Sequence, residues 1–424
     1  MNRFPIGFWN YTTGELSAKD VKDWVELGMT MASSPNITED TDKKTILEIL
    51  DACAENDIKV IMCDKRTFWK GASERPEEYR ARSAAAYEDF GKHPAVFGFE
   101  IGDEPERGND FPDCVAAHNI QLELAPNLTP FLNFLPYWEG QEETILKAPS
   151  FLDWATKMIK DANLKVLSYD CYTQLNPEME KEAHLKLFGY DRDPKPDSEE
   201  EGIHMYFRNL HLYREAAERM GISPWTTLLS VGHWKYRCPN EDDLRWQLST
   251  AVASGMEGIM WFHIYERECR LNYRLAPIDA FGERTETFNW LARTNKYFLH
   301  QFGDFFNRAK WIKTLHYGKA YGEFELWEKD KSDNLVMDVS SPHNLKAVIG
   351  FFELEGKKYV AVVNNSPTET GLIRIHVSKK AKSVLQWDWN SNLVCGKYTN
   401  VTDNEYICGD WYAPGQMKLY CIEG

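Results

Sequence analysis

Two adjacent acids, Asp103 and Glu104, end one of the most apolar segments of the sequence. The segment, HPAVFGFEIGDEP over residues 93–105, predicts a buried strand with an Asp-Glu-Pro tripeptide at its carboxyl end. Pro105 restricts the backbone of Glu104. A carboxyl group in an aromatic, partly desolvated pocket has a raised pKa, so it can act as a general acid near neutral pH. The plainer alternative is that one acid caps the next helix or pairs with Arg107.

The elements that would position these acids recur along the first 302 residues, where short apolar runs alternate with amphipathic patterns. Strands are expected at residues 5–10, 28–34, 58–64, 95–101, 129–135, 164–170, 225–232 and 257–264. Helices are expected at 17–28, 43–56, 75–91, 150–162, 206–221, 242–255 and 285–303. This alternation favours a closed (β/α)8 TIM barrel of the α/β class. An open doubly wound sheet is the alternative, but no GxGxxG turn follows the first strand.

After residue 302 the pattern changes to short alternating segments separated by turn residues, which predicts an all-β sandwich. The expected domains are a catalytic barrel at 1–302 and a C-terminal sandwich at 319–424, joined by a connection at 303–318. The polar stretch 190–202 is expected to form an exposed loop.

The composition indicates a folded, acidic globular protein. Lys and Arg number 49 against 65 for Asp and Glu, a net charge of −16, which argues against nucleic-acid binding. The sequence contains no run of about 18 apolar residues, the length that would predict a membrane-spanning helix. The first ten residues lack the apolar region of a secretory signal, so a cytoplasmic location is expected, or a periplasmic or extracellular one if a leader has been removed.

Several kinds of chemistry find no support in the sequence. The first expected strand has no HxH pair, and the nine cysteines show no CxxC spacing, so we expect no metal site. No P-loop or GxSxG nucleophile elbow is present either, and no cofactor is expected.

The active site of a TIM barrel lies at the carboxyl ends of its strands, so the candidates are residues in or just past those ends. They are Phe8, Trp9, Asn10, Tyr11, Asp64, Lys65, Arg66, Glu100, Asp103, Glu104, Asn133, Tyr137, Trp138, Glu139, Tyr169, Asp170, Tyr172, His233, Trp234, Trp261, His263, Tyr265 and Glu266.

With Asp-Glu-Pro ending its fourth expected strand, the chain resembles the retaining glycoside hydrolases of the clan A barrels, where that strand ends in Asn-Glu-Pro or a near variant. The resemblance covers the barrel and the appended sandwich, as in some β-galactosidase-like enzymes. It implies hydrolysis of a glycosidic bond with Glu104 as acid/base, and Asp103 stands where the clan usually has Asn. The clan's nucleophilic Glu ends strand seven, whereas here that strand ends in TLLSVGHWKY without a carboxylate.

Glycosidic hydrolysis normally uses a second carboxyl group, and Asp170 is the favoured candidate because a strand fixes its position. It would act as nucleophile at about 5–5.5 Å from Glu104, or as base for an inverting water at about 6.5–9.5 Å. A helix cap is the plainer role for Asp170. Glu266 or Glu268, just past strand eight, is a further candidate.

Substrate assistance is the remaining alternative, in which the substrate's own acetamido oxygen attacks. The Asp103-Glu104 pair, the Tyr169-Asp170 pair and Trp261 resemble the arrangement in chitinases and hexosaminidases.

Aromatic side chains at the strand ends are expected to stack on a carbohydrate substrate. Trp261 is expected to form the floor of a sugar subsite, and His263 and Tyr265 share its strand parity. Core packing is the alternative for Trp261. The other expected substrate contacts are Trp9, Asn10, Tyr137, Trp138, Tyr169, Tyr172, His233, Trp234 and Glu266.

Two further groups have weaker claims. Lys65 and Arg66 could bind an acidic sugar, although a solvated basic pair is favoured. In the sandwich, Trp387, Trp389 and Trp411 could bind sugar, although a structural role is favoured.

The sequence thus predicts a glycoside hydrolase acting on an oligo- or polysaccharide, with Glu104, Asp170 and Asp103 as catalytic residues. The alternative is a noncatalytic carbohydrate-binding or scaffold protein on a degenerate barrel, which would explain the missing carboxylate on strand seven. The sugar, its linkage and the oligomeric state do not follow from the sequence.

Overall fold

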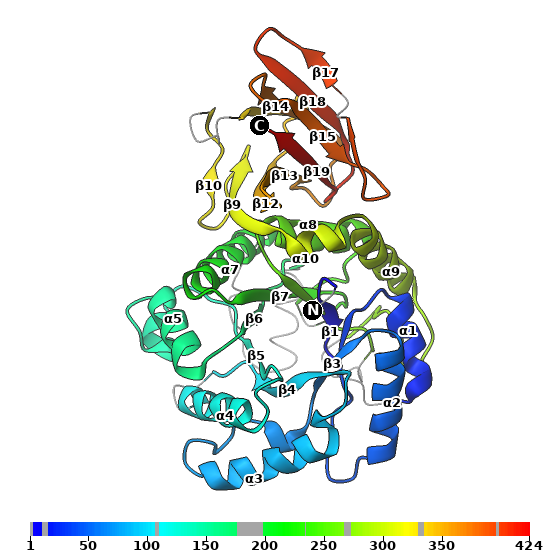
Figure 1. Ribbon diagram of the computed structural model, residues 1–424, viewed down its shortest axis with the longest axis vertical. Coiled ribbons are helices and arrows are strands. Elements are labelled where there is room, and N and C mark those ends of the chain that lie inside the picture. The colour runs from blue at the N-terminus through cyan, green and yellow to red at the C-terminus, as the bar shows by residue number, and fades with distance from the viewer. Residues whose placement is uncertain are drawn as a thin grey trace.

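The first sheet of the computed structural model is a parallel barrel of eight strands (Figure 1). The structure describes residues 3–10, 16–106, 110–175, 198–233, 235–266, 273–329, 335–395 and 398–424. The barrel strands are β1 (Ile6–Phe8), β2 (Met31–Ser33), β3 (Lys59–Met62), β4 (Val96–Asp103), β5 (Phe131–Phe134), β6 (Val166–Asp170), β7 (Ser223–Leu229) and β8 (Gly258–Phe262). They are hydrogen-bonded in the order β1-β8-β7-β6-β5-β4-β3-β2. The Thr30 N–H donates to the Ile6 carbonyl at 2.8 Å and so brings β2 back to β1. The predicted (β/α)8 barrel is confirmed.

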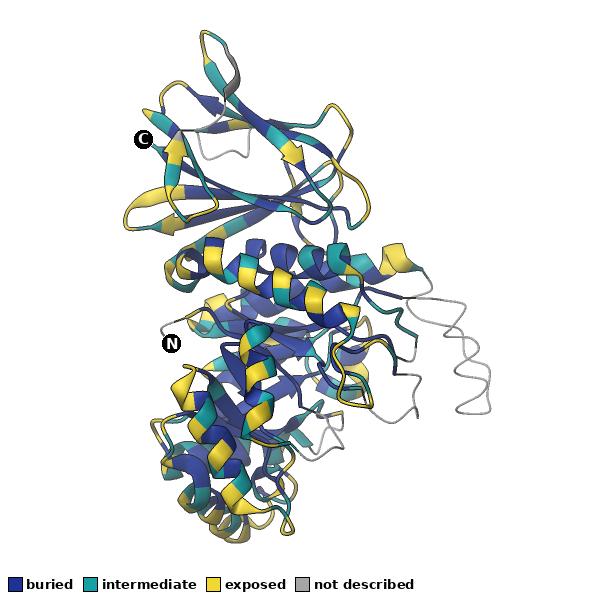
Figure 2. Cartoon of the chain, turned by 90° about the vertical axis from the view of Figure 1, so that its right-hand side faces the viewer, coloured by how far each residue is buried: buried dark blue, intermediate teal, exposed yellow. Residues whose placement is uncertain are grey.

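Helices surround this barrel and present exposed outer faces (Figure 2). They are α1 (Val21–Glu26), α2 (Lys43–Glu55), α3 (Pro76–Ala86), α4 (Asp110–Leu124), α5 (Phe151–Ala162), α7 (Glu199–Met220), α8 (Glu241–Ala253) and α9 (Glu286–Phe298). Helix α4 was not expected, because buried His118 and Gln121 on its packed face blur the apolar period. None of the described helices is long and apolar enough to cross a membrane.

Helix α7 starts inside the segment expected to be an exposed loop. Residues 199–202 form its first turn, and the Ser198 hydroxyl caps it by accepting the Glu201 N–H at 3.2 Å. Tyr11, Arg107, Trp234 and Glu268, all considered from the sequence, lie outside the described residues.

Large side chains fill the inside of the barrel, as they do in TIM barrels generally. Trp9, Met31, Ile61, Phe131, Trp225 and Met260 form this inner cluster. The Trp225 ring lies so close to Gly258 that a Cβ there would stand 2.4 Å from it. The barrel is therefore a packed scaffold, and a site can open only at its ends.

The alternation of side chains along β8 corrects two predicted site residues. Met260 points into the barrel, so Trp261 points outward, where it is fully buried and its indole N–H donates to Asn295 of α9 at 3.1 Å. Tyr265 also packs outward, and its hydroxyl accepts the Trp24 indole N–H of α1 at 2.7 Å. Both residues belong to the layer between barrel and helices and not to the mouth.

The C-terminal region forms two antiparallel-rich sheets, which confirms the predicted sandwich. One sheet has the order β10-β9-β12-β13-β19-β15-β16 and the other β11-β14-β18-β17. The first sheet contains β9 (Lys310–Tyr317), β10 (Glu325–Leu326), β12 (Ala347–Leu354), β13 (Lys357–Asn364), β15 (Ser383–Trp387), β16 (Leu393–Cys395) and β19 (Met417–Glu423). The second contains β11 (Val336–Ser340), β14 (Gly371–Ser378), β17 (Tyr398–Val401) and β18 (Glu405–Tyr412). Short helix α10 (Asp304–Arg308) and strand β9 occupy the segment expected to be a connection.

Helix α8 joins the two parts of the molecule because it is covered on both sides. Most of its residues are buried, and it lies between the barrel and the first sandwich sheet (Figure 1). The Trp246 indole N–H donates to Asn365 at 2.9 Å, and the Thr314 hydroxyl donates to the Ala253 carbonyl at 2.8 Å. Gly350 is required here, since a Cβ would lie 2.4 Å from that same carbonyl oxygen.

The outward position of Trp261 generates a stability prediction. Trp261→Ala should lower the free energy of unfolding by about 3–5 kcal/mol in urea denaturation, because a large ring leaves a packed layer. Trp138→Ala is the control, since the Trp138 side chain is 37% exposed, and it should change stability by less than about 1 kcal/mol. A Trp261→Ala protein as stable as the unchanged protein would contradict the assignment of this ring to the core.

Candidate active site

Three neighbouring strands bring acids and an amide together at the carboxyl end of the barrel. Asp103 on β4 pairs in register with Asn133 on β5, which pairs with Ser168 on β6. The Asn133 amide donates to Asp103 Oδ1 at 3.0 Å and to Asp170 Oδ1 at 2.9 Å. Its own oxygen accepts the Ser168 hydroxyl at 2.9 Å, which fixes the direction of the amide. Asn133 is thus the bridge between the acids of β4 and β6.

Glu104 and Asp170 form a pair of carboxyl groups that shift each other's pKa. Burial raises the pKa of Glu104, and the charges of Asp170 and Asp103 raise it further. Burial also raises the pKa of Asp170, and Asp103 adds to this, whereas the Asn133 amide opposes it. Because burial and the charges of Asp170 and Asp103 all raise the pKa of Glu104, we place a proton on Glu104 at neutral pH. The pair is therefore a carboxylic acid held against a carboxylate.

The backbone that carries Glu104 is in an uncommon conformation. Glu104 has a φ of 48°, in the left-handed region that costs a residue with a side chain about 1–2 kcal/mol. Its N–H donates to the Asn133 carbonyl at 3.0 Å, which holds the turn. Two residues earlier Gly102 has a φ of 149°, and a Cβ there would lie 2.0 Å from the Trp69 ring. Strain of this kind concentrates at functional sites.

A cavity of about 430 Å³ opens on the side of β1 to β4, where Asp103 and Glu100 line it, whereas Glu104 and Asp170 are not among its lining residues. Its lining residues are Trp9, Asn10, Asn36, Cys63, Lys65, Phe68, Trp69, Lys70, Glu100, Gly102 and Asp103. The volume lies in the range of small-molecule sites. Trp9 and Asn10, both predicted substrate contacts, are among these lining residues and are largely buried.

Glu100 was among the strand-end residues but was not predicted to belong to the site. It is 5% exposed, lines this cavity, and lies near the Cys63 thiol. Burial raises its pKa to about 7; the thiol opposes this rise and Asp103 adds to it. The strand period could have found it, because Glu100 and Gly102 line the same cavity from alternate positions of β4.

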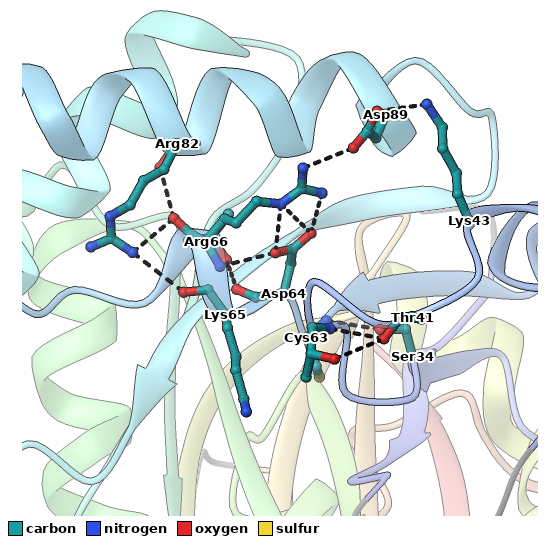
Figure 3. A network of polar contacts seen from close by, with 12 residues as sticks. Ser34, Thr41, Lys43, Cys63, Asp64, Lys65, Arg66, Arg82 and Asp89 are labelled. Atoms are coloured by element: carbon teal, nitrogen blue, oxygen red, sulfur yellow. Dashed lines mark hydrogen bonds and ion pairs between the residues drawn. The ribbon is translucent and has the colours of Figure 1, made fainter.

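The predicted basic pair after β3 divides into two roles, which Figure 3 shows. Arg66 binds the buried Asp64 with both ends of its guanidinium, at 3.0 and 2.7 Å, and Asp89 at 2.8 Å. Asp89 in turn accepts Lys43 at 2.6 Å. The Lys65 side chain points away from this network and lines the cavity. Arg66 therefore has a structural role in its ion pairs with Asp64 and Asp89, and Lys65 is the residue of this basic pair that lines the cavity.

An aromatic cluster stands on the opposite side of the acids. Tyr172 packs against Phe262 with ring centres 5.7 Å apart, and the charges of Asp170 and Glu104 add to the effect of burial in raising its pKa. His233 stacks on Tyr273 at 5.2 Å, and burial lowers its pKa to about 3, so it is neutral. Phe262 occupies the inward position on β8 that was predicted for Trp261.

Four other predicted contacts lie away from the acids. Tyr169 alternates with the inward Ser168 and Asp170, so it faces outward and stacks on Tyr213 of α7 at 3.9 Å. The Tyr137 N–H donates to Asn209 of α7 at 2.6 Å, and its ring packs on Phe151 of α5.

Beyond β8, His263 is fully buried with its ring 5.3 Å from Tyr273. Burial and the charge of Asp279 raise the pKa of Glu266, whereas the backbone of Ala276 and Leu275 opposes this rise. Glu266 thus lies against residues of its own loop. In the described part of the chain, no cluster of three or more His, Cys, Asp or Glu residues is arranged to hold a metal ion.

Comparisons with known proteins place this geometry in a fold. No protein-family model and no curated protein sequence matches the chain. Solved structures do match. The cold-adapted β-galactosidase from Rahnella sp. R3 has a TM-score of 0.54 at 9% identity, over 99% of this chain and 98% of that one. The fold is that of barrel glycoside hydrolases.

Two other solved structures agree. A glycoside hydrolase family 5 protein from Bacteroides vulgatus ATCC 8482 has a TM-score of 0.54 at 12% identity, over 99% of this chain and 89% of that one. The β-galactosidase from Halorubrum lacusprofundi has a TM-score of 0.51 at 14% identity, over 70% of this chain and 58% of that one, so the match spans less than two thirds of that enzyme. At these identities the likeness is one of fold alone.

The raised pKa of Glu104 predicts how stability depends on pH. The folded state binds the proton of the Glu104 carboxyl group more tightly than the unfolded chain does, where this group titrates at about pH 4.3. The stability that this proton binding adds is complete below that pH and is lost as the pH rises toward the folded-state pKa. The amide of Glu104→Gln does not titrate, so the variant does not lose this stability. At about pH 8 its free energy of unfolding should therefore exceed that of the unchanged protein by about 1 kcal/mol or more.

This excess should shrink as the pH is lowered to about 5, as measured by urea denaturation at each pH. Glu77→Gln, at an exposed position on α3, should follow the unchanged protein throughout. Parallel stability curves for Glu104→Gln and the unchanged protein would show that Glu104 titrates normally.

Proposed function

We propose that this protein is a glycoside hydrolase in which Glu104 donates the proton to the leaving oxygen. The observation that carries the proposal is the pair of buried carboxyl groups Glu104 and Asp170 at the carboxyl end of a TIM barrel, whose neighbour Asp103 lines a ligand-sized cavity. Asp170 holds Glu104 in its protonated form, and Asn133 holds Asp170 in place. Trp9 and Trp69 in the cavity wall supply aromatic surface for a sugar ring.

The contact within the pair bears on the second half of the reaction. Retaining enzymes hold their two carboxyl groups about 5–5.5 Å apart, and inverting enzymes hold them about 6.5–9.5 Å apart. We propose substrate assistance, in which Asp170 acts on the acetamido group, with direct attack by Asp170 as the alternative. The acetamido oxygen of the substrate would attack the anomeric carbon while the bond to the leaving oxygen breaks and that oxygen takes the Glu104 proton.

Water then opens the cyclic intermediate and returns a proton to Glu104, so the enzyme ends as it began. In this scheme Asp170 orients the acetamido group and offsets the positive charge that develops on it. The two schemes differ in substrate, because only the first requires an acetamido group beside the anomeric carbon.

A noncatalytic carbohydrate-binding protein is the second candidate, and the end of β7 favours it. In the described part of that end the chain continues from Leu229 through Ser230 and Val231, with no carboxylate. The Ser230 hydroxyl donates to the His263 carbonyl at 3.0 Å and so has a structural partner.

The Glu104→Gln variant separates these functions. On an unactivated oligosaccharide its turnover should fall by about 10²- to 10⁴-fold, because the amide cannot donate the proton that the leaving oxygen needs. On a dinitrophenyl glycoside, whose leaving group needs little protonation, the loss should be smaller. The rates are measured on glycosides with and without a 2-acetamido group. Full activity of Glu104→Gln on the oligosaccharide would overturn the assignment, and inactivity of the unchanged protein on all substrates would favour the binding protein.

Asn133→Ala tests the positioning role of the bridging amide. The amide lowers the pKa of Asp170, so its removal should move the acidic limb of kcat/KM toward higher pH by about one unit. Asn119→Ala is the control, since that amide donates to the Asp161 carbonyl at 2.8 Å among the outer helices. Its pH profile should not move. A lowered kcat with an unmoved limb in Asn133→Ala would mean that the amide only supports the fold.

A further inference from the structure

A second hollow surface lies where the barrel helices meet the sandwich. Two adjoining hollows, each of about 270 Å³, share Tyr297, Gln416 and Met417 and so form one junction trough. One part is lined mainly by α8 and α9, and the other by the turn that joins β15 to β16. The junction trough shares no lining residue with the cavity that Glu100 and Asp103 line.

The turn of the junction trough displays an aromatic ring to solvent. Trp389 is 57% exposed, with its ring centre 5.0 Å from that of Tyr297 and 5.5 Å from that of His300. The neighbouring Trp387 is different, because its indole N–H donates to the Gln301 carbonyl at 2.7 Å and its ring packs on Phe305. Trp387 anchors the turn, and Trp389 is the ring left available.

Hydrogen bonds hold this turn in one shape. The Asp388 carboxylate accepts the N–H groups of Asn390 at 3.0 Å and Asn392 at 2.8 Å. The Ser391 hydroxyl donates to the carbonyls of His300 at 2.6 Å and Gln301 at 2.9 Å. An aromatic ring on a fixed turn loses little conformational entropy when it binds a ligand.

The polar lining of the junction trough points to a neutral, hydroxyl-rich ligand. Gln301 is only 8% exposed, and its side-chain oxygen has no hydrogen-bond partner, an arrangement that costs free energy until a donor is supplied. Gln386 lines the same part. The basic residues of the lining are each paired with an acid: Arg245 with Asp242, Arg293 with Glu241, and Lys418 with Asp410. The lining therefore offers no unpaired positive charge to an anion.

We propose that the junction trough is a second carbohydrate-binding site, which takes a neutral sugar residue of a polysaccharide chain. The C–H face of the sugar stacks on Trp389, and its hydroxyl groups bond to the amides of Gln386 and Gln301. The site would hold the protein on a polymer without taking part in bond cleavage. It stands whether or not Glu104 is catalytic.

Affinity electrophoresis tests this site, with galactomannan, xylan, β-glucan or linear galactan in the gel. The parent protein carries Glu104→Gln, so that cleavage does not remove the polymer. The parent should be retarded by at least one of the four polymers, and adding Trp389→Ala should weaken that binding by about tenfold, because one aromatic contact is lost. Adding Gln386→Ala should weaken it in the same direction, and a melting curve of each variant checks that it is folded.

Trp411 supplies a matched control, because it is also 57% exposed and lies on β18 of the other sheet. Trp411→Ala should leave the retardation unchanged. On an aryl glycoside, Trp389→Ala in the unchanged active site should keep its kcat/KM. Equal retardation of the Trp389→Ala and parent proteins, or no retardation of the parent by any of the four polymers, would overturn the second site. Neither result would bear on cleavage by Glu104, which the turnover measurements decide separately.

Discussion

One side-chain amide holds the acidic centre of the barrel together. Asn133 offers its two N–H bonds to Asp103 and Asp170, and Ser168 fixes the direction of the amide through its oxygen. Without it, carboxyl groups on β4 and β6 would face each other in poorly solvated space, where repulsion between like charges is costly. The amide can stand there because β5 lies between those two strands. The order of strands in the sheet is therefore part of the electrostatics of the site.

The rest of the barrel maintains an arrangement that is unfavourable in isolation. Glu104 is strained in its backbone and buried among other acids, and Glu100 adds another buried carboxyl group nearby. Such groups are kept only where the surrounding packing outweighs their cost. The inner cluster around Trp225 and the ion pairs of Arg66 with Asp64 and Asp89 make the adjoining strands rigid. Preorganisation of this kind is what lets a carboxylic acid keep its proton near neutral pH.

The sequence predicted the barrel, the sandwich and the strand end that carries Asp103 and Glu104, because apolar runs and turn residues are local signals. Asn133 was expected at a strand end without a specific role, because the bridge depends on the register between strands that are far apart in the chain. The sequence misplaced Trp261 and Tyr169. A barrel strand is buried on both faces, so its apolar run does not reveal which residues point inward. The buried position of Asp64 and the partners of Arg66 likewise follow only from tertiary packing.

The double burial of α8 has a consequence for how the chain is made. Its buried residues, including Leu244, Trp246 and Val252, face the barrel on one side and the first sandwich sheet on the other. The strands that cover the second side, among them β12 and β13, follow the whole barrel in the chain and are therefore synthesised after it. Until then a barrel folded on its own would expose the apolar residues of α8 to solvent or to a chaperone. The last quarter of the chain thus completes the folding unit of the first three quarters.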